Sequence, residues 1–298
     1  MVLEILNAIP FPDWISDTAI PLPGPLSIKW YGLGYVVGAL LAYFYAVRTC
    51  KKDELWVPKK TPVGSALIPN KRMLEDYLFY CFLGIFLGGR IGFILLYGLE
   101  EYMAEPMRIF KIWEGGMAFH GGFLGVCLAA IYLAKKKKLR LMRVADLAAI
   151  GAPIGLGLVR LANFANQELY GRVTDVPWAF YFKGGWQARH PSQLYEAFLE
   201  GFVIFAVLWV ATRKFKILTK PGLAAGICIA LYGVFRIFVE NFREPDVGAA
   251  QFGPLTLGMI YSLPMLIIGT LVIIWAMKRP PVAPTRPAEE DTPENADA

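Results

Sequence analysis

Residues 159–171, with the sequence VRLANFANQELYG, place polar side chains directly after an apolar, glycine-rich segment at 147–158. One arginine, two asparagines and one glutamate therefore stand where a membrane helix is expected to end. Such groups at a lipid boundary are costly unless they pair with one another or meet a polar ligand. The stretch is either a crowded helix terminus or part of a polar site, and the rest of the sequence bears on that choice.

The composition is that of a membrane protein. The 298 residues are 56% hydrophobic, with a mean hydropathy of +0.46, whereas a soluble domain is about 45–50% apolar. Seven apolar segments approach the roughly 20 residues that cross a bilayer. We expect helices, because backbone groups in lipid must be satisfied within the segment, and the short alternating strands of a barrel are absent. The segments are residues 30–47, 77–97, 117–134, 144–159, 193–211, 222–239 and 257–277.

Lysine and arginine predict the orientation of these helices. Twenty of the 30 basic residues follow the first, third, fifth and seventh segments, and the positive-inside rule makes that side cytoplasmic. The prediction is an all-α polytopic domain, 1–278, with seven transmembrane helices, the N-terminus outside and the C-terminus inside. A loop at about 161–192 would form a small external head. Residues 279–298, rich in proline and acidic side chains, would form a disordered cytoplasmic tail.

Several classes of function are not indicated. The four cysteines show neither a disulfide framework nor zinc-ligand spacing. Motifs for nucleotide phosphates, metalloproteases and serine hydrolases are missing. We therefore expect no metal, no cofactor and no nucleic-acid partner, and we attribute the net charge of +6 to the cytoplasmic loops. The first 27 residues do not resemble a cleavable signal peptide, so the first membrane helix would serve as the targeting signal.

The two histidines both lie at predicted outer helix ends. His120 is flanked on both sides by glycine pairs, which leave room for a ligand, and a neutral imidazole there could act as a general base. His190 precedes a proline at the start of the fifth segment. A structural role in shaping that helix is the simpler interpretation for His190, with substrate binding as the alternative.

The end of the sixth segment carries charges on one helical face. Arg236 and Glu240 are four residues apart, and Arg243 follows three residues later, so the three share a face. Arg160 and Asn163 make a similar face at the end of the fourth segment. One such cluster could be an ion pair that locks helix packing, but two on the same side predict a polar cavity for an anionic ligand.

Two further residues have a structural and a functional interpretation. Arg90 lies within the second segment among glycines that favour close helix packing, where it could pair structurally or contact substrate. Tyr31 begins the first segment on the outside. Aromatic anchoring at the interface explains it, and a hydrogen bond to a lipid headgroup is the alternative.

These motifs together resemble a known family, from about residue 27 to residue 277. The chain is similar to bacterial prolipoprotein diacylglyceryl transferases. The family usually has glycine where this chain has Val159, Ala162 and Gln167, whereas the polar positions are retained. The resemblance rests on WYG at 30–32, GGRIG at 88–92, GGMAFHGG at 115–122, residues 160–171, HPSQLYE at 190–196 and FRIFVE at 235–240.

The resemblance implies an activity and its residues. The family moves the diacylglyceryl group of phosphatidylglycerol onto the lipobox cysteine of a prolipoprotein signal peptide, forming a thioether and releasing glycerol phosphate. The enzyme would lie in the bacterial inner membrane as a multi-pass protein, with its active site toward the outer leaflet. Catalytic roles are expected for His120, Arg160, Arg236 and Glu240, and substrate binding for Tyr31, Asn163, Glu168, Gly171, Arg90, His190 and Arg243.

Two other classes of protein remain as alternatives. A transporter or flippase for anionic lipid would also use intramembrane arginines, and residues 149–157, with Pro153, Gly155 and Gly157, could form its broken helix. It would need a polar path to the cytoplasmic side, and the sequence places no ionisable residues along the inner halves of the segments. A purely structural or receptor-like protein would leave the clustering of His, Arg and Glu unexplained.

Overall fold

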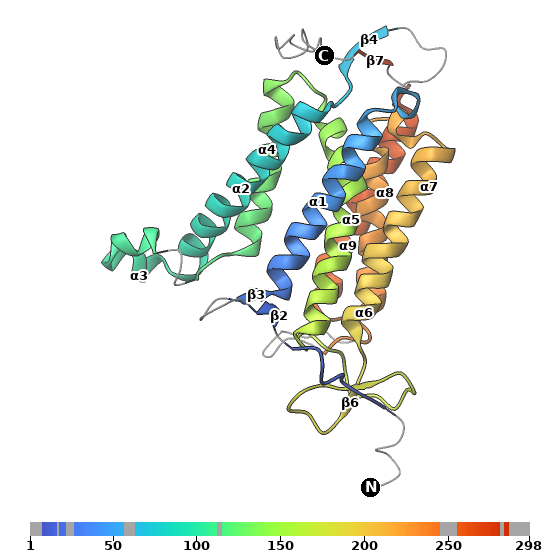
Figure 1. Ribbon diagram of the computed structural model, residues 1–298. Helices are drawn as coiled ribbons and strands as arrows, with labels where there is room; N and C mark the ends of the chain where they lie inside the picture. Colours follow the sequence, from blue (N-terminus) through green and yellow to red (C-terminus); the bar gives the residue numbers. More distant parts are fainter. Residues whose placement is uncertain are drawn as a thin grey trace. The chain divides into compact units, whose positions relative to one another are not determined.

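The computed structural model describes residues 8–16, 18–21, 27–56, 63–111, 115–244, 255–280 and 283–285, and most of them are helical (Figure 1). The chain divides into two compact units. The first comprises residues 1–48 and 146–280, and the second comprises residues 49–145 and 281–298. The first unit contains five of the predicted apolar segments and the second contains two.

Within the described residues, five helical segments are long and apolar enough to cross a bilayer. They are α1 (Trp30–Cys50), α2 (Lys71–Tyr97), α5 (Leu141–Ala165), the continuous segment Ser192–Lys214, and α9 (Leu257–Lys278). Two more helices, α4 (Phe119–Lys136) and α8 (Leu223–Val239), coincide with the two remaining predicted segments. The helical, polytopic class is confirmed, whereas the count of seven spans and the sidedness of the termini stay predictions.

The segment Ser192–Lys214 is built from three helical pieces. It begins as α6 (Ser192–Glu196), continues as the π-helical turn η5 (Ala197–Val203), and ends as α7 (Ile204–Lys214). A π-helical turn is rare and occurs often at functional sites. In this protein the turn follows directly after Glu196 and contains a second buried glutamate, Glu200.

Small residues allow the helices of the first unit to approach closely. A Cβ added at Gly157 of α5 would lie 3.2 Å from the Cα of Gly201 in η5. On α8, a Cβ at Gly226 would lie 3.1 Å from the carbonyl oxygen of Gly269 in α9. Such contacts are typical of membrane helices, in which small residues let backbones meet.

Helix α5 is continuous and does not break at 149–157. Pro153 lies inside the helix, so the discontinuous helix that a transporter would need is not found there. The sequence reasoning also overlooked a buried acidic residue near the predicted cytoplasmic end of α5. Asp146 is fully buried, and its carboxylate accepts hydrogen bonds from the backbone N–H groups of Gly222 and Ala225, at 2.7 and 3.0 Å. It therefore satisfies the start of α8 and does not line a polar path.

The head lies between α5 and α6 in the sequence. Because α5 continues to Ala165, the head begins about five residues later than the predicted position 161. Strand β5 (Phe180–Tyr181) pairs in parallel with β1 (Ile9–Pro10) and antiparallel with β6 (Ala188–Arg189). Beneath it, Phe164 at the end of α5 contacts Phe11 and Phe180, with ring centroids 5.2 and 5.3 Å apart. The aromatic cluster thus fastens this small sheet to the end of the helix.

The remaining elements of the first unit are short. Strands β2 (Thr18–Pro21) and β3 (Ser27–Lys29) form an antiparallel pair that leads into α1. The 3₁₀ turn η6 (Ile217–Thr219) links α7 to α8. Thr256 caps α9, because its hydroxyl accepts a hydrogen bond from the N–H of Met259 at 3.2 Å.

The second unit is organised around α2 and α4, which lie side by side (Figure 1). Glycines face each other across the pair: a Cβ at Gly84 would lie 2.5 Å from the carbonyl oxygen of Gly125, and a Cβ at Gly92 would lie 2.7 Å from the Cα of Gly121. The two backbones therefore touch, as the glycines of the second segment predicted.

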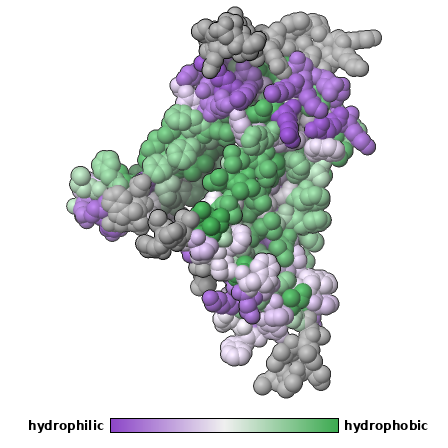
Figure 2. All heavy atoms as spheres, viewed as in Figure 1, coloured by the Kyte–Doolittle hydropathy of each residue, from purple (hydrophilic) through white to green (hydrophobic). Residues whose placement is uncertain are grey.

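The second unit also contains short elements that the sequence did not predict. They are η2 (Asp53–Leu55), β4 (Val63–Leu67), α3 (Leu99–Ala104), η3 (Pro106–Phe110) and β7 (Ala283–Thr285), with β4 and β7 paired in parallel. The predicted disordered tail, 279–298, lies largely outside the described residues. Figure 2 shows hydrophobic surface along the helices of each unit, in keeping with the many exposed leucine, isoleucine and phenylalanine side chains.

Candidate active site

Three helices of the first unit bring charged side chains together. Arg160 stands one turn before the end of α5, Glu196 ends α6, and Arg236 lies in the last turn of α8. Arg160 and Arg236 lie near the ends of apolar helices, and Glu196 lies near the start of the apolar segment Ser192–Lys214. The apolar helix bodies therefore hold the charged groups at one end of this unit.

Glu196 is the centre of the cluster, and sequence reasoning did not single it out. Its side chain is 0% exposed. One carboxylate oxygen, Oε1, accepts hydrogen bonds from Nη1 of Arg236 and, at 2.8 Å, from Nη1 of Arg243. The other, Oε2, lies 3.0 Å from Nε of Arg160. One buried carboxylate thus contacts all three arginines.

Glu240 also contacts two of these arginines. Its Oε2 lies 3.4 Å from Nη2 of Arg236 and 3.4 Å from Nε of Arg243. Its Oε1 accepts a hydrogen bond from the hydroxyl of Thr256, at 3.0 Å. The three residues thus meet as predicted, although they do not share one helical face, because α8 ends at Val239 and Arg243 lies in the segment that follows. Through Thr256 the cap of α9 joins the same network.

A third carboxylate, Glu200, lies one turn beyond Glu196 in η5, and sequence reasoning did not single it out. It is fully buried, and its nearest ion-pair contact is Nε of Arg160 at 3.9 Å. Neither of its oxygens accepts or donates a hydrogen bond. With Arg160, Arg236 and Arg243, the three carboxylates make a cluster of formal charge zero when all six groups are ionised; we name these six residues the Arg–Glu cluster.

A hydrogen-bonded chain extends from the Arg–Glu cluster to α1. Nη1 of Arg160 donates to the side-chain oxygen of Asn163 at 3.4 Å. The amide nitrogen of Asn163 donates to the hydroxyl of Tyr31, which donates to the carboxylate of Glu168. The structure therefore brings Tyr31, Asn163 and Glu168 together, and the hydroxyl of Tyr31 bonds within the protein.

Gly171 and His190 lie where two segments of the head meet the segment that follows α8. The N–H of Gly171 donates to the carbonyl oxygen of His190 at 2.8 Å, and Gly171 forms a bridge with Arg243. A Cβ at position 171 would lie 2.7 Å from the Cβ of His190. Only glycine fits this crossing, which holds the backbone of Arg243 next to the start of α6.

His190 itself is engaged in packing. Its Nδ1 lies 3.1 Å from the hydroxyl of Tyr195, and its ring packs edge-on against Phe242 with centroids 5.2 Å apart. Burial lowers the pKa of His190, although Asp175 acts in the opposite direction. These contacts support the structural interpretation of His190, at the start of α6.

His120 and Arg90 belong to the second unit. His120 is the second residue of α4; its side chain is exposed and packs edge-on against Phe119, with centroids 5.8 Å apart. Arg90 is buried, and its guanidinium donates to the carbonyl oxygens of five residues. Those residues are Arg108, Ile109, Lys111, Gly115 and Gly116.

The contacts of Arg90 explain two of the glycines before His120. Gly115 and Gly116 have φ values of +83° and +84°, a backbone conformation that favours glycine. Their carbonyl oxygens accept hydrogen bonds from Nη1 of Arg90. Arg90 therefore fixes the segment that leads into α4, which favours the structural interpretation of this arginine over substrate binding.

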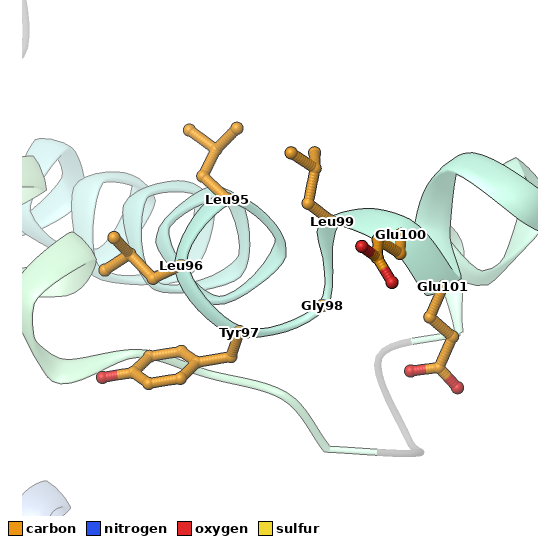
Figure 3. A pocket seen from close by; sticks show the side chains of 7 residues that line it. All are labelled: Leu95, Leu96, Tyr97, Gly98, Leu99, Glu100 and Glu101. Atoms are coloured by element: carbon orange, nitrogen blue, oxygen red, sulfur yellow. The ribbon is translucent and has the colours of Figure 1, made fainter.

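Two other features of the described residues carry no site assignment. Among the residues that the structure describes, no group of three His, Cys, Asp or Glu side chains is arranged to hold a metal ion. A shallow depression of about 610 Å³ lies at the turn between α2 and α3. The side chains that line the depression point outward instead of converging (Figure 3). None of the lining residues is a predicted site residue.

Comparison with known proteins agrees with the resemblance seen in the sequence. The family described as prolipoprotein diacylglyceryl transferase matches residues 17–275. Relatives from Brucella anthropi, Brucella ovis and Brucella abortus are each 46% identical over 276 residues, which is 92% of this chain and 94% of each relative. All three are named phosphatidylglycerol–prolipoprotein diacylglyceryl transferase. With its buried Arg–Glu cluster on an apolar helical scaffold, the chain belongs to the prolipoprotein diacylglyceryl transferase family.

Proposed function

We propose that this protein transfers the diacylglyceryl group of phosphatidylglycerol to the lipobox cysteine of a prolipoprotein, the first step of bacterial lipoprotein maturation. Family membership supports the reaction. The observation that carries the assignment of the site is that three arginines gather on one buried carboxylate, Glu196, at the end of an apolar bundle. Guanidinium groups in that setting suit the phosphate of a lipid whose tails remain in the membrane.

In the proposed reaction the arginines would stabilise the transition state as well as bind the lipid. The cysteine sulfur would attack the glycerol carbon that bears the phosphate, a carbon–sulfur bond would form, and the carbon–oxygen bond would break with its electron pair leaving on the phosphate. The phosphodiester has one negative charge and the departing glycerol phosphate has two. Arg160 and Arg236 would therefore bind the transition state more tightly than the ground state, which is the condition for catalysis.

The remaining residues of the first unit have proposed roles in binding. Glu240 would orient Arg236 and Arg243, with which it is paired. The hydroxyl, amide and carboxylate of Tyr31, Asn163 and Glu168 form one hydrogen-bonded chain, which could accept and donate to the hydroxyls of the glycerol headgroup. Gly171 would hold the crossing at Arg243, and His190 would support the start of α6.

We propose that His120 removes the proton from the cysteine thiol. A thiol has a pKa of about 8.5 and needs a base or a positive field to become a nucleophile at neutral pH. His120 is exposed at the start of α4 and makes no hydrogen bond within the described residues. Loss of a general base typically lowers a rate by about 10²–10⁴.

The pH–rate profile of His120→Gln at saturating lipid separates a base from a lipid contact. A base predicts a slow variant whose rate no longer follows the titration seen in the wild type. A variant that keeps the wild-type pH dependence and loses rate only through lipid binding would exclude His120 as the base. In that case the thiolate would be formed by the field of the arginines or by a carboxylate such as Glu240.

We propose seven spans in the bacterial inner membrane, with the Arg–Glu cluster toward the outer leaflet. The helix ends opposite the cluster carry cytoplasmic-type basic residues, such as Arg213 and Lys214 in the last turn of α7. A lipobox cysteine exported through the membrane would be available on the outer side.

To test the activity, the purified protein is incubated with phosphatidylglycerol and a lipobox peptide, and the mass of the peptide is measured by mass spectrometry. The proposal expects the mass of one diacylglyceryl group on the cysteine, and no such product with a peptide whose cysteine is replaced by serine. Folded protein that yields no adduct under these conditions would refute the transferase assignment. Movement of intact lipid between leaflets without an adduct would favour the transporter.

A further inference from the structure

Glu200 is a buried acid for which the proposed reaction has no use. It lies in the π-helical turn η5, one turn after Glu196, with a side chain that is 0% exposed. Both of its oxygens are buried and neither has a hydrogen-bond partner. Of the three carboxylates in the Arg–Glu cluster, it is the least compensated, since its closest cation, Nε of Arg160, is 3.9 Å away and lies nearer to Glu196, at 3.0 Å.

The groups around Glu200 come from three helices. Arg160 faces it from α5, Glu196 from the preceding turn, and Tyr232 and Arg236 from α8, while Arg243 acts on it from beyond the end of α8. Three cations in this cluster are matched by three carboxylates. An anionic lipid headgroup that binds the arginines would therefore bring in a negative charge that no remaining cation offsets.

A buried cluster does not tolerate an unmatched charge. Leaving a charge uncompensated in a low-dielectric interior costs several kcal/mol, and ionisable groups avoid that cost by exchanging a proton. Of the three carboxylates, the one without hydrogen bonds loses the fewest contacts when it accepts a proton. Protonating Glu196 or Glu240 would weaken contacts to two or three arginines, whereas protonating Glu200 would break none that is shorter than 3.9 Å.

We propose that Glu200 takes up a proton when an anionic phosphodiester headgroup binds the Arg–Glu cluster, so that headgroup binding and proton uptake are coupled. This inference rests on the proposed function, because it takes the donor to be a phosphate-bearing lipid. Neutral Glu200 keeps the occupied cluster close to zero charge, and it leaves Glu196 ionised to hold the arginines in place. Glu200 is thus a residue that selects for an anionic headgroup without touching it.

Calorimetry on the complete protein in detergent measures the coupling directly. Short-chain phosphatidylglycerol is titrated into the protein at pH 8, without acceptor peptide, once in Tris and once in HEPES. Because these buffers release different heats on ionisation, the difference between the two binding enthalpies gives the number of protons taken up. We expect about one proton per lipid bound in the wild type, and none in Glu200→Gln.

The affinity gives a second measure. Linkage predicts that the Kd of the wild type for phosphatidylglycerol rises by up to tenfold per pH unit in the alkaline range, while that of Glu200→Gln stays flat. Glu244→Gln, an exposed carboxylate paired with Arg189 outside the cluster, is the matched control and should behave as the wild type. Phosphatidylcholine with the same acyl chains should show no linked uptake.

The outcomes separate this inference from the proposed function. Phosphatidylglycerol that binds the wild type with no proton uptake would refute the coupling, whatever the variants do. Equal uptake in the wild type and in Glu200→Gln would show that another group takes the proton. Failure of phosphatidylglycerol to bind the folded wild type at all would instead count against the donor itself.

Discussion

At the scale of single residues, Glu196 is the side chain on which the site depends. Its two oxygens contact Arg160, Arg236 and Arg243. Without that carboxylate, the three guanidinium groups would repel one another and lose their orientation. The charge of Glu196, and not the volume of its side chain, is therefore what holds the three guanidinium groups together.

The substitution Glu196→Gln keeps the volume and removes the charge. Breaking a buried ion pair on one side costs about 3–5 kcal/mol, so we expect a lower unfolding temperature in detergent and at least a tenfold loss of transfer activity. The control is Glu244→Gln, which removes an exposed partner of Arg189 and should cost about 0–1 kcal/mol. Equal stability of the two variants would contradict the central role of Glu196.

At the scale of elements, Arg90 connects α2 to the segment that precedes α4. The five carbonyl oxygens that accept hydrogen bonds from Arg90 belong to residues between positions 108 and 116. Gly115 and Gly116, two of these residues, have a left-handed backbone conformation. His120 follows four residues later. The arginine therefore acts on the start of α4 through backbone groups.

The substitution Arg90→Lys distinguishes this role from substrate binding. A single ammonium cannot reach five carbonyl oxygens that a planar guanidinium holds, so the start of α4 should loosen. We expect kcat to fall by about tenfold or more while KM for phosphatidylglycerol stays within twofold, a split that removal of ground-state binding would not give. A rise in KM with unchanged kcat would restore the substrate-binding assignment of Arg90.

Much of the helical framework could be predicted from the sequence, because hydrophobicity alone sets where a chain can cross lipid. All seven apolar segments coincide with helices, and the bounds differ by more than three residues only in α2, which begins six residues before position 77, and in α5, which ends six residues after position 159. The pairing of Arg236 with Glu240 followed from their spacing of four. These features are local, and a helical period is enough to derive them.

The centre of the site could not be predicted, because it depends on how helices pack. Glu196 and Glu200 stand in an apolar segment, and nothing in their spacing says that they face Arg160 and Arg236, which are 36 and 40 residues from Glu196 in the sequence. The spacing of four between Glu196 and Glu200 in an apolar segment could have indicated a polar site, but not which residues these carboxylates face. The same holds for Asp146, whose role as a cap appears only once α8 is placed beside it.

At the scale of the whole molecule, the orientation in the membrane can be measured. We expect a membrane-impermeant thiol reagent added from outside to label a single cysteine at position 183, in the head, and to spare one at position 137, after α4. The physical reason is the excess of lysine and arginine around Lys137. Labelling at 137 and protection at 183 would invert the topology and move the Arg–Glu cluster to the inner leaflet.

The central claim is that the guanidinium groups of the Arg–Glu cluster hold the phosphate of the lipid donor as its charge increases. The most direct measurement is the rate of diacylglyceryl transfer to a lipobox peptide by Arg160→Lys and Arg236→Lys, compared with Arg213→Lys, whose side chain stacks on Trp209. Lysine keeps the charge and loses the planar fork, so each cluster variant should lose at least tenfold in rate while Arg213→Lys retains the wild-type rate. Full activity of both cluster variants would show that the arginines serve only as counter-charges or in packing, and would contradict the account.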